Sequence, residues 1–213
     1  MRFLFLTIFC SIFHCNLDGY LPNLKSNNTK ASTVSSKAKK GRKSVDFYDN
    51  TKVGTVLDEL DGVAIYFNGP ISNVNGRNTT ADGYNLGLKY QCVEFVKRYY
   101  YEYYGHKMPN TYGHANEFFD HSLKGHGYNR SRGLIQHPNG GVMKPQKGDL
   151  LVFNGNSSNP FGHVGIISKV GTDFVEIIQQ NVAKSTRATY KLQVYGSYYN
   201  IADPDIAGWL RKS

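Results

Sequence analysis

The chain has 213 residues, 40% of them hydrophobic, which suffices for the core of one domain of ordinary size plus some non-globular sequence. Its net charge of +9 would suggest a nucleic-acid partner if the charge were spread over the folded part. Residues 21–45, however, hold seven lysines and arginines and no acid, and residues 1–20 are neutral, which leaves +2 after Val45. The body of the chain is nearly balanced, so we predict no nucleic-acid partner.

Residues 1–19 are typical of a secretory signal peptide. Arg2 precedes an apolar run from Phe3 to Phe13, which is too short to span a bilayer. A buried segment that is not cleaved is the alternative interpretation. We therefore predict a protein that is secreted or periplasmic.

Residues 20–45 are predicted to be a flexible basic linker. From Leu24 to Val45 the sequence has almost no large apolar residue and cannot bury enough surface to order itself. Such an arm could hold the protein to an anionic cell-wall polymer; a solvated linker without a partner is an equal alternative.

The first half of the predicted domain, residues 46–213, combines a strand with helices. Val63–Phe67 is a strand candidate, and Asn73–Gly87 reads as a loop. Apolar residues at helical spacing from Val93 onward predict a helix with one packed face, for which Gly105 supplies the C′ residue. A second short helix is expected over Asn116–Leu123, followed by polar, irregular sequence.

The second half changes to strands. Asp149–Phe153 is an apolar run after a turn, and His163–Lys169 with Phe174–Asn181 reads as a hairpin. A last strand pair is expected in Lys191–Tyr199 and Ile206–Leu210. Helices followed by an antiparallel sheet predict an α+β fold in which N-terminal helices pack on a C-terminal sheet.

Cys92 is the cysteine that suggests chemistry, because Cys10 and Cys15 would leave with the signal peptide. It lies at the predicted start of a helix, where unpaired N–H groups and the helix dipole stabilise a thiolate. A small buried hydrophobe is the alternative, and the position favours a reactive thiol.

A cysteine nucleophile needs a base and a third group that orients the base. Among the histidines, only His163 begins a well-marked strand, whereas His106, His114, His121, His126 and His137 lie in polar surroundings that favour a surface role. Alternation along a strand places Gln179 and Asn181 on one face, so either amide could orient His163.

Three motifs resemble those of the CHAP family, the cysteine, histidine-dependent amidohydrolases and peptidases. They are Gln-Cys-Val-Glu-Phe at 91–95, Gly-His-Val-Gly-Ile-Ile at 162–167 and Gln-Gln-Asn at 179–181. The likeness is strongest to the amidase domain of glutathionylspermidine synthetase/amidase and extends over most of residues 50–211. It implies a papain-like fold, Cys92 as nucleophile, His163 as base, and an oxyanion hole formed by the Cys92 N–H with help from Gln91. In the amidase subfamily a glutamate occupies the position of Gln179, so a weaker enzyme or a shifted pH optimum is expected.

The resemblance implies a cysteine-dependent hydrolase of amide bonds that needs no cofactor or metal. Peptide crosslinks of bacterial peptidoglycan are the substrate that a secreted monomer with a basic arm suggests. Hydrolysis of a glutathione–polyamine amide is the alternative within the same reaction class. A catalytically weak module that binds a peptide in the same groove is the alternative from another class.

Overall fold

The computed structural model describes residues 50–213; the predicted signal peptide, linker and domain start lie outside the described residues. The first half of this part contains β1 (Val56–Leu60), β2 (Val63–Tyr66), β3 (Arg77–Thr79), β4 (Asn85–Leu88), helix α1 (Cys92–Tyr104) and the 3₁₀ helix η1 (Ala115–Phe118). The second half contains β5 (Gly127–Asn129), β6 (Leu134–Pro138), β7 (Leu150–Phe153), β8 (His163–Val170), β9 (Phe174–Ile178), β10 (Arg187–Tyr195), β11 (Tyr198–Ile201) and β12 (Ile206–Arg211).

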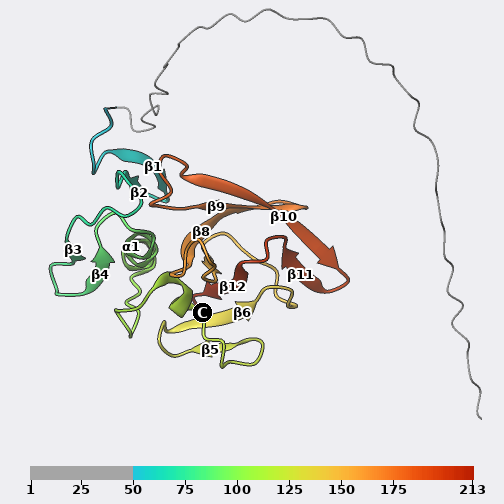
Figure 1. Ribbon diagram of the computed structural model, residues 1–213. Coiled ribbons are helices and arrows are strands. Elements are labelled where there is room, and N and C mark those ends of the chain that lie inside the picture. Colours follow the sequence, from blue (N-terminus) through green and yellow to red (C-terminus); the bar gives the residue numbers. More distant parts are fainter. Residues whose placement is uncertain (1–49) are drawn as a thin grey trace, which may run out of the picture. The chain divides into compact units, whose positions relative to one another are not determined.

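Eight strands form one antiparallel sheet with the order β11-β10-β9-β8-β7-β12-β6-β5 (Figure 1). β8 and β9 are the predicted hairpin, and β7 is the predicted apolar strand. An isolated bridge joins Gly141, after β6, to Tyr199 in β11, so the sheet curls back on itself. β1 with β2, and β3 with β4, form two small separate sheets.

The central strands of the large sheet, such as β7 and β8, are buried on both faces. Leu150 and Val152 of β7 belong to a core shared with α1, whereas Leu151 and Phe153 belong to a second core around Trp209. This alternation follows from the two-residue period of a strand. Helix α1 packs on β8, which places its N-terminus against the start of that strand.

Helix α1 begins and ends where the sequence predicts, and Gly105 adopts the left-handed C-cap conformation with φ of 61°. The prediction of a single packed face is incomplete, since the charged side chains of Glu94, Lys97 and Arg98 are buried as well. The Lys97 ammonium, for example, donates to backbone carbonyls, including that of Thr111 at 2.9 Å. Burial is tolerated because each of these polar groups finds partners.

The α+β prediction needs correction in its helical part. Among residues 50–213, α1 and the short η1 are the helices, and the segment before α1 forms strands β1 to β4. Asn116–Leu123 yields only part of η1, and β3 and β4 lie in the expected loop Asn73–Gly87. Strands of three or four residues with polar side chains lack the alternation that reveals a strand, so they escape prediction.

The end of the chain also pairs differently from the prediction. β10 turns at Gly196 into β11, and the two pair with each other, whereas β12 inserts between β6 and β7. The stretch Gly127–Gly141, expected to be irregular, supplies β5 and β6. These pairings join segments distant in sequence, which local patterns do not encode.

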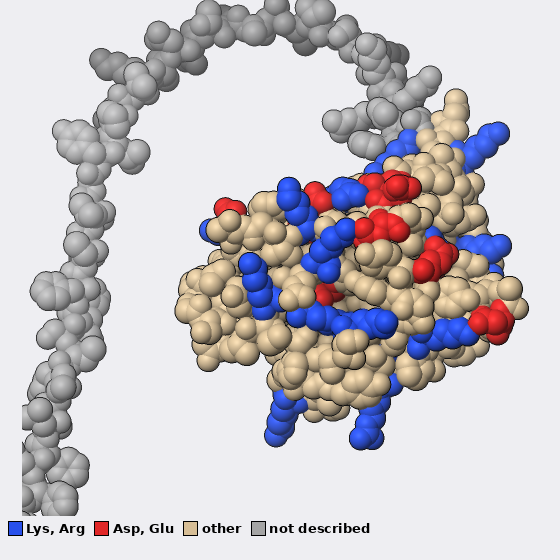
Figure 2. Space-filling model, turned by 180° about the vertical axis from the view of Figure 1, so that it is seen from behind, with Lys and Arg blue, Asp and Glu red and all other residues tan. Residues whose placement is uncertain are grey.

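Charges on the folded part are mixed. Figure 2 shows lysine and arginine interspersed with acidic side chains on the face drawn there. Within residues 50–213, no helix is both long and apolar enough to cross a membrane.

Candidate active site

Cys92 is the first residue of α1, and Gln91 is its N-cap in an extended conformation (φ −85°, ψ 159°). The preceding Tyr90 is left-handed, with φ of 67°, so the chain turns sharply into the helix. Cys92 as a residue is half-buried, its thiol is in no disulfide, and backbone N–H groups of Val164 and Val93 interact with its sulfur. The helix tip therefore presents Cys92 to the beginning of β8.

His163 is the first residue of β8, directly before the Val164 whose N–H contacts the Cys92 sulfur. The chain enters β8 through Gly162, which has φ of 70°. A Cβ atom at this glycine would lie 2.4 Å from the Phe153 carbonyl oxygen, so only glycine fits there. The residue that carries the imidazole is therefore the chain neighbour of the residue whose N–H contacts the Cys92 sulfur.

The His163 ring is held by Gln179, whose Oε1 lies 3.0 Å from the ring Nε2. The Gln179 amide is oriented by its other end, because its Nε2 donates to the Ser185 carbonyl at 3.3 Å. Since Oε1 can only accept, the imidazole Nε2 carries the proton and donates it to Gln179. Nδ1 is then the nitrogen free to take a proton, as a general base must.

The surroundings of the Cys92 thiol and of the His163 ring both favour the neutral form. Burial lowers the pKa of His163 to about 4, outweighing the hydrogen bond that the ring donates to Gln179, which raises this pKa. Burial also raises the pKa of the Cys92 thiol, although the backbone N–H groups at the sulfur oppose this. Both shifts favour a neutral thiol and a neutral imidazole over a thiolate–imidazolium pair.

Asn181 makes no hydrogen bond to His163. It adopts a left-handed conformation with φ of 67°, beyond the end of β9, so strand alternation no longer determines its direction. Its Nδ2 donates to Gln91 Oε1 at 2.6 Å, and its Oδ1 accepts from Asn68 at 2.8 Å. Of the two amides proposed to orient the imidazole, Gln179 is the one in contact.

Gln91, proposed for the oxyanion hole, is fixed at both ends of its side chain. Its Oε1 accepts from Asn181, and its Nε2 donates to the Asn73 carbonyl at 2.8 Å. An amide nitrogen has two donors, so a second N–H remains for a ligand. Asn181 and Asn73 therefore set the direction in which Gln91 can donate.

Two residues near the site were missed from the sequence: Gln180 and Glu94 are both buried and hydrogen-bonded to each other at 2.9 Å. The alternation of side chains along a strand predicts that Gln180 points to the opposite face from Gln179 and Asn181, and the structure agrees. The sequence alone gave Gln180 no function. A carboxylate in the first turn of a buried helix was the available signal for Glu94.

His137 corrects the prediction that the remaining histidines lie on the surface. It is only 2% exposed in β6, and its Nδ1 lies 2.9 Å from the Nδ1 of His126. Because β6 itself was not predicted, the burial of His137 could not be either.

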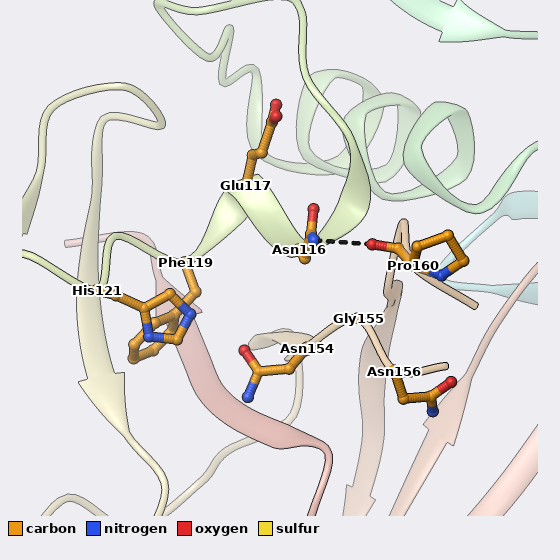
Figure 3. A pocket seen from close by; sticks show the side chains of 8 residues that line it. All are labelled: Asn116, Glu117, Phe119, His121, Asn154, Gly155, Asn156 and Pro160. Atoms are coloured by element: carbon orange, nitrogen blue, oxygen red, sulfur yellow. Dashed lines mark hydrogen bonds between the residues drawn. The ribbon is translucent and has the colours of Figure 1, made fainter. Parts of the chain in front are cut away.

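An open depression of about 570 Å³ lies beside the loop that leads to His163 (Figure 3). Asn116 donates to the Pro160 carbonyl at 3.1 Å along its wall. Cys92 and His163 are not among its lining residues, which are Asn116, Glu117, Phe119, His121, Asn154, Gly155, Asn156 and Pro160. Among residues 50–213, no group of three histidine, cysteine or acidic side chains is arranged to hold a metal ion.

A thiol at a helix N-terminus, beside an imidazole that an amide holds in one tautomer, is the arrangement found in cysteine-dependent amidases and peptidases. Comparison with known families agrees with this class. The CHAP domain matches residues 81–181, a stretch that contains Cys92, His163, Gln179 and Asn181. The predicted resemblance to the CHAP family is thereby confirmed over these residues, and a papain-like fold fits this match.

Two curated relatives are similar to this stretch. Trypanothione synthetase from Crithidia fasciculata is 33% identical over 107 residues, which are 50% of this chain and 16% of the relative. The bifunctional glutathionylspermidine synthetase/amidase of Escherichia coli (strain K12) is 31% identical over 138 residues, 59% of this chain and 22% of the relative. The chain thus spans less than a quarter of the length of either relative.

Proposed function

We propose that the chain hydrolyses amide bonds with Cys92 as nucleophile and His163 as general base. The observation that carries this proposal is the bond from His163 Nε2 to Gln179 Oε1, next to a thiol at the tip of α1. That bond leaves Nδ1 unprotonated and prevents the ring from turning. A histidine with only a structural role would have no need of a fixed tautomer beside a cysteine.

The reaction follows from the neutral resting pair. As the sulfur attacks the carbonyl carbon, the thiol proton passes to His163 Nδ1 and the carbonyl oxygen becomes an oxyanion. The Cys92 N–H and the second N–H of Gln91 donate to that oxyanion. The imidazolium then gives its proton to the amine as the C–N bond breaks, and water releases the acyl group from the sulfur with His163 again as base.

The neutral Gln179 has a consequence for this mechanism. It orients the imidazole but supplies no charge to stabilise the imidazolium that forms in the transition state. Proton transfer therefore accompanies attack instead of preceding it. We expect slower turnover than a carboxylate at this position would support.

For the substrate we propose an amide of a glutathione-like peptide or a crosslinking peptide of bacterial peptidoglycan. The name of the Escherichia coli relative, a glutathionylspermidine synthetase/amidase, supports the first. The signal-like residues 1–19 and the basic residues 21–45 support the second, through secretion and attraction to an anionic wall polymer. A peptide-binding module without turnover is the candidate that the neutral Gln179 favours.

The test is to incubate the purified protein with glutathionylspermidine and, separately, with peptidoglycan, and to identify products by mass spectrometry. Cys92→Ser and His163→Ala should each lower the rate on the order of 10⁴-fold, while His121→Ala, which removes an exposed imidazole, should not. Turnover that survives Cys92→Ser would refute the nucleophile. Absence of turnover on both substrates by the wild-type protein, with retained peptide binding, would favour the binding module.

A further inference from the structure

The three residues after β9 each fasten to a different part of the site. Gln179 holds the His163 ring and Asn181 holds the Gln91 side chain, as described above. Gln180, between them, points the other way into the protein and is 1% exposed. A buried amide between two site residues either packs in the core without a further role or fixes the positions of its two neighbours.

The contacts of Gln180 join three elements at one point. Its Oε1 accepts from the Tyr66 N–H of β2 at 2.8 Å. Its Nε2 donates to the Gln91 carbonyl at 3.0 Å and to Glu94 Oε2 at 2.9 Å. Both donors of the amide are used, so the side chain has one orientation only. Gln91 immediately precedes Cys92, so one bond ties Gln180 directly to the backbone that carries the thiol.

Glu94 makes this attachment rigid. It is 1% exposed, and its Oε1 accepts from Arg98 at 2.7 Å and from Asn78 at 2.8 Å. Arg98 in turn donates to the Ala64 carbonyl of β2 at 2.8 Å. The Glu94 carboxylate therefore accepts hydrogen bonds at both of its oxygens, and only one position of the side chain allows all of these bonds at once.

We propose that Gln180, held by Glu94, is a positioning residue that sets the separation between the Cys92 helix tip and the Gln179–His163 pair. This inference rests on the proposed function and deepens it. The bonds of Gln180 fix the backbone between Gln179 and Asn181 relative to the start of α1. A displacement of Gln180 would move the imidazole partner and the Gln91 partner together, away from the thiol.

Gln180→Met tests this, because methionine has a similar length and removes all three hydrogen bonds. A misplacement of about 1 Å lowers rates on the order of 10²-fold, so kcat should fall roughly 10- to 100-fold with KM within about twofold. Gln136→Met is the matched control. Gln136 is equally buried and also makes three hydrogen bonds, but to Asp120 and Asn129, outside the site. This control should be destabilised similarly and keep kcat near that of the wild type.

The rate of Cys92 alkylation by iodoacetamide across pH gives a second readout that needs no substrate. Gln180→Met should change this profile and Gln136→Met should not, because only the first alters the surroundings of the thiol. If Gln180→Met fails to fold, Glu94→Gln replaces it, since an amide there offers one acceptor to three donors and displaces Gln180. The proposal is overturned if kcat and the profile stay as in the wild type, or if the control changes both equally. Failure of the proposed function is seen separately, as absence of Cys92-dependent turnover in the wild-type protein, and the alkylation profile then decides the positioning role alone.

Discussion

Gln179→Glu introduces the charge that the site lacks. A carboxylate at this position would lie about as far from His163 Nε2 as the present 3.0 Å contact. Two unit charges roughly 4 Å apart interact by about 4 kcal/mol at an effective dielectric constant of 20, and by about 1 kcal/mol in water. The site is partly exposed, so the effect lies between these limits. Each ~1.4 kcal/mol is one pKa unit, so the pKa of His163 should rise by roughly one to three units from its value of about 4.

The consequence is a change in the resting state of the pair. A more basic imidazole makes the thiolate–imidazolium form roughly 10- to 1,000-fold more populated relative to the neutral form. Alkylation of Cys92 by iodoacetamide at pH 7 should accelerate by up to that factor. The acidic limb of hydrolysis, expected near pH 4 because the ring must be neutral to accept the thiol proton, should move to higher pH.

Gln193→Glu in β10 is the control, because it adds the same charge away from the site, where Gln193 accepts from Asn200 at 2.8 Å. It should leave the alkylation rate and the acidic limb as they are. If Gln179→Glu also leaves the alkylation rate within twofold of the wild type and does not move the acidic limb, the charge at position 179 does not interact with the imidazole. The orientation of His163 by Gln179 would then be refuted as the basis of its reactivity.

Gln179→Ala should alter the pH profile of hydrolysis, whereas Asn181→Ala should lower kcat without moving the acidic limb, because Asn181 contacts Gln91 and not His163; identical profiles for the two variants would contradict this. Deleting Leu24–Val45 should leave small-substrate turnover unchanged and weaken binding to peptidoglycan at low salt, where the attraction between the basic residues and the anionic polymer is least screened (the screening length is about 10 Å at 0.1 M salt). If the deletion does not change this binding, these residues are only a linker. Burial lowers the pKa of His137 to about 4, so below pH 6.5 the unfolded chain binds more protons than the folded protein does. The free energy of unfolding should therefore fall as the pH drops from 6.5 toward 4, by up to about 3 kcal/mol from this residue. Urea titrations of His137→Gln at pH 7 and pH 4.5 should show a smaller difference than the wild type, and an equal difference would refute the assignment.

The sequence by itself determined the elements whose signals are local. Helical spacing from Val93 to Gly105, the apolar run of β7 and the turn between β8 and β9 each predicted an element that the structure contains. The same local signals singled out Cys92 at a helix start and His163 at a strand start. The motifs around them then indicated the CHAP family.

Only the tertiary structure decided which side chains meet. Alternation left Gln179 and Asn181 equivalent, and the left-handed backbone at Asn181 separates them, so one reaches His163 and the other reaches Gln91. Glu94 and Gln180 are 86 positions apart, and nothing in the neighbourhood of either predicts their bond. Such contacts form because the curled sheet brings the end of β9 to the start of α1, and that arrangement depends on pairings between segments distant in the chain.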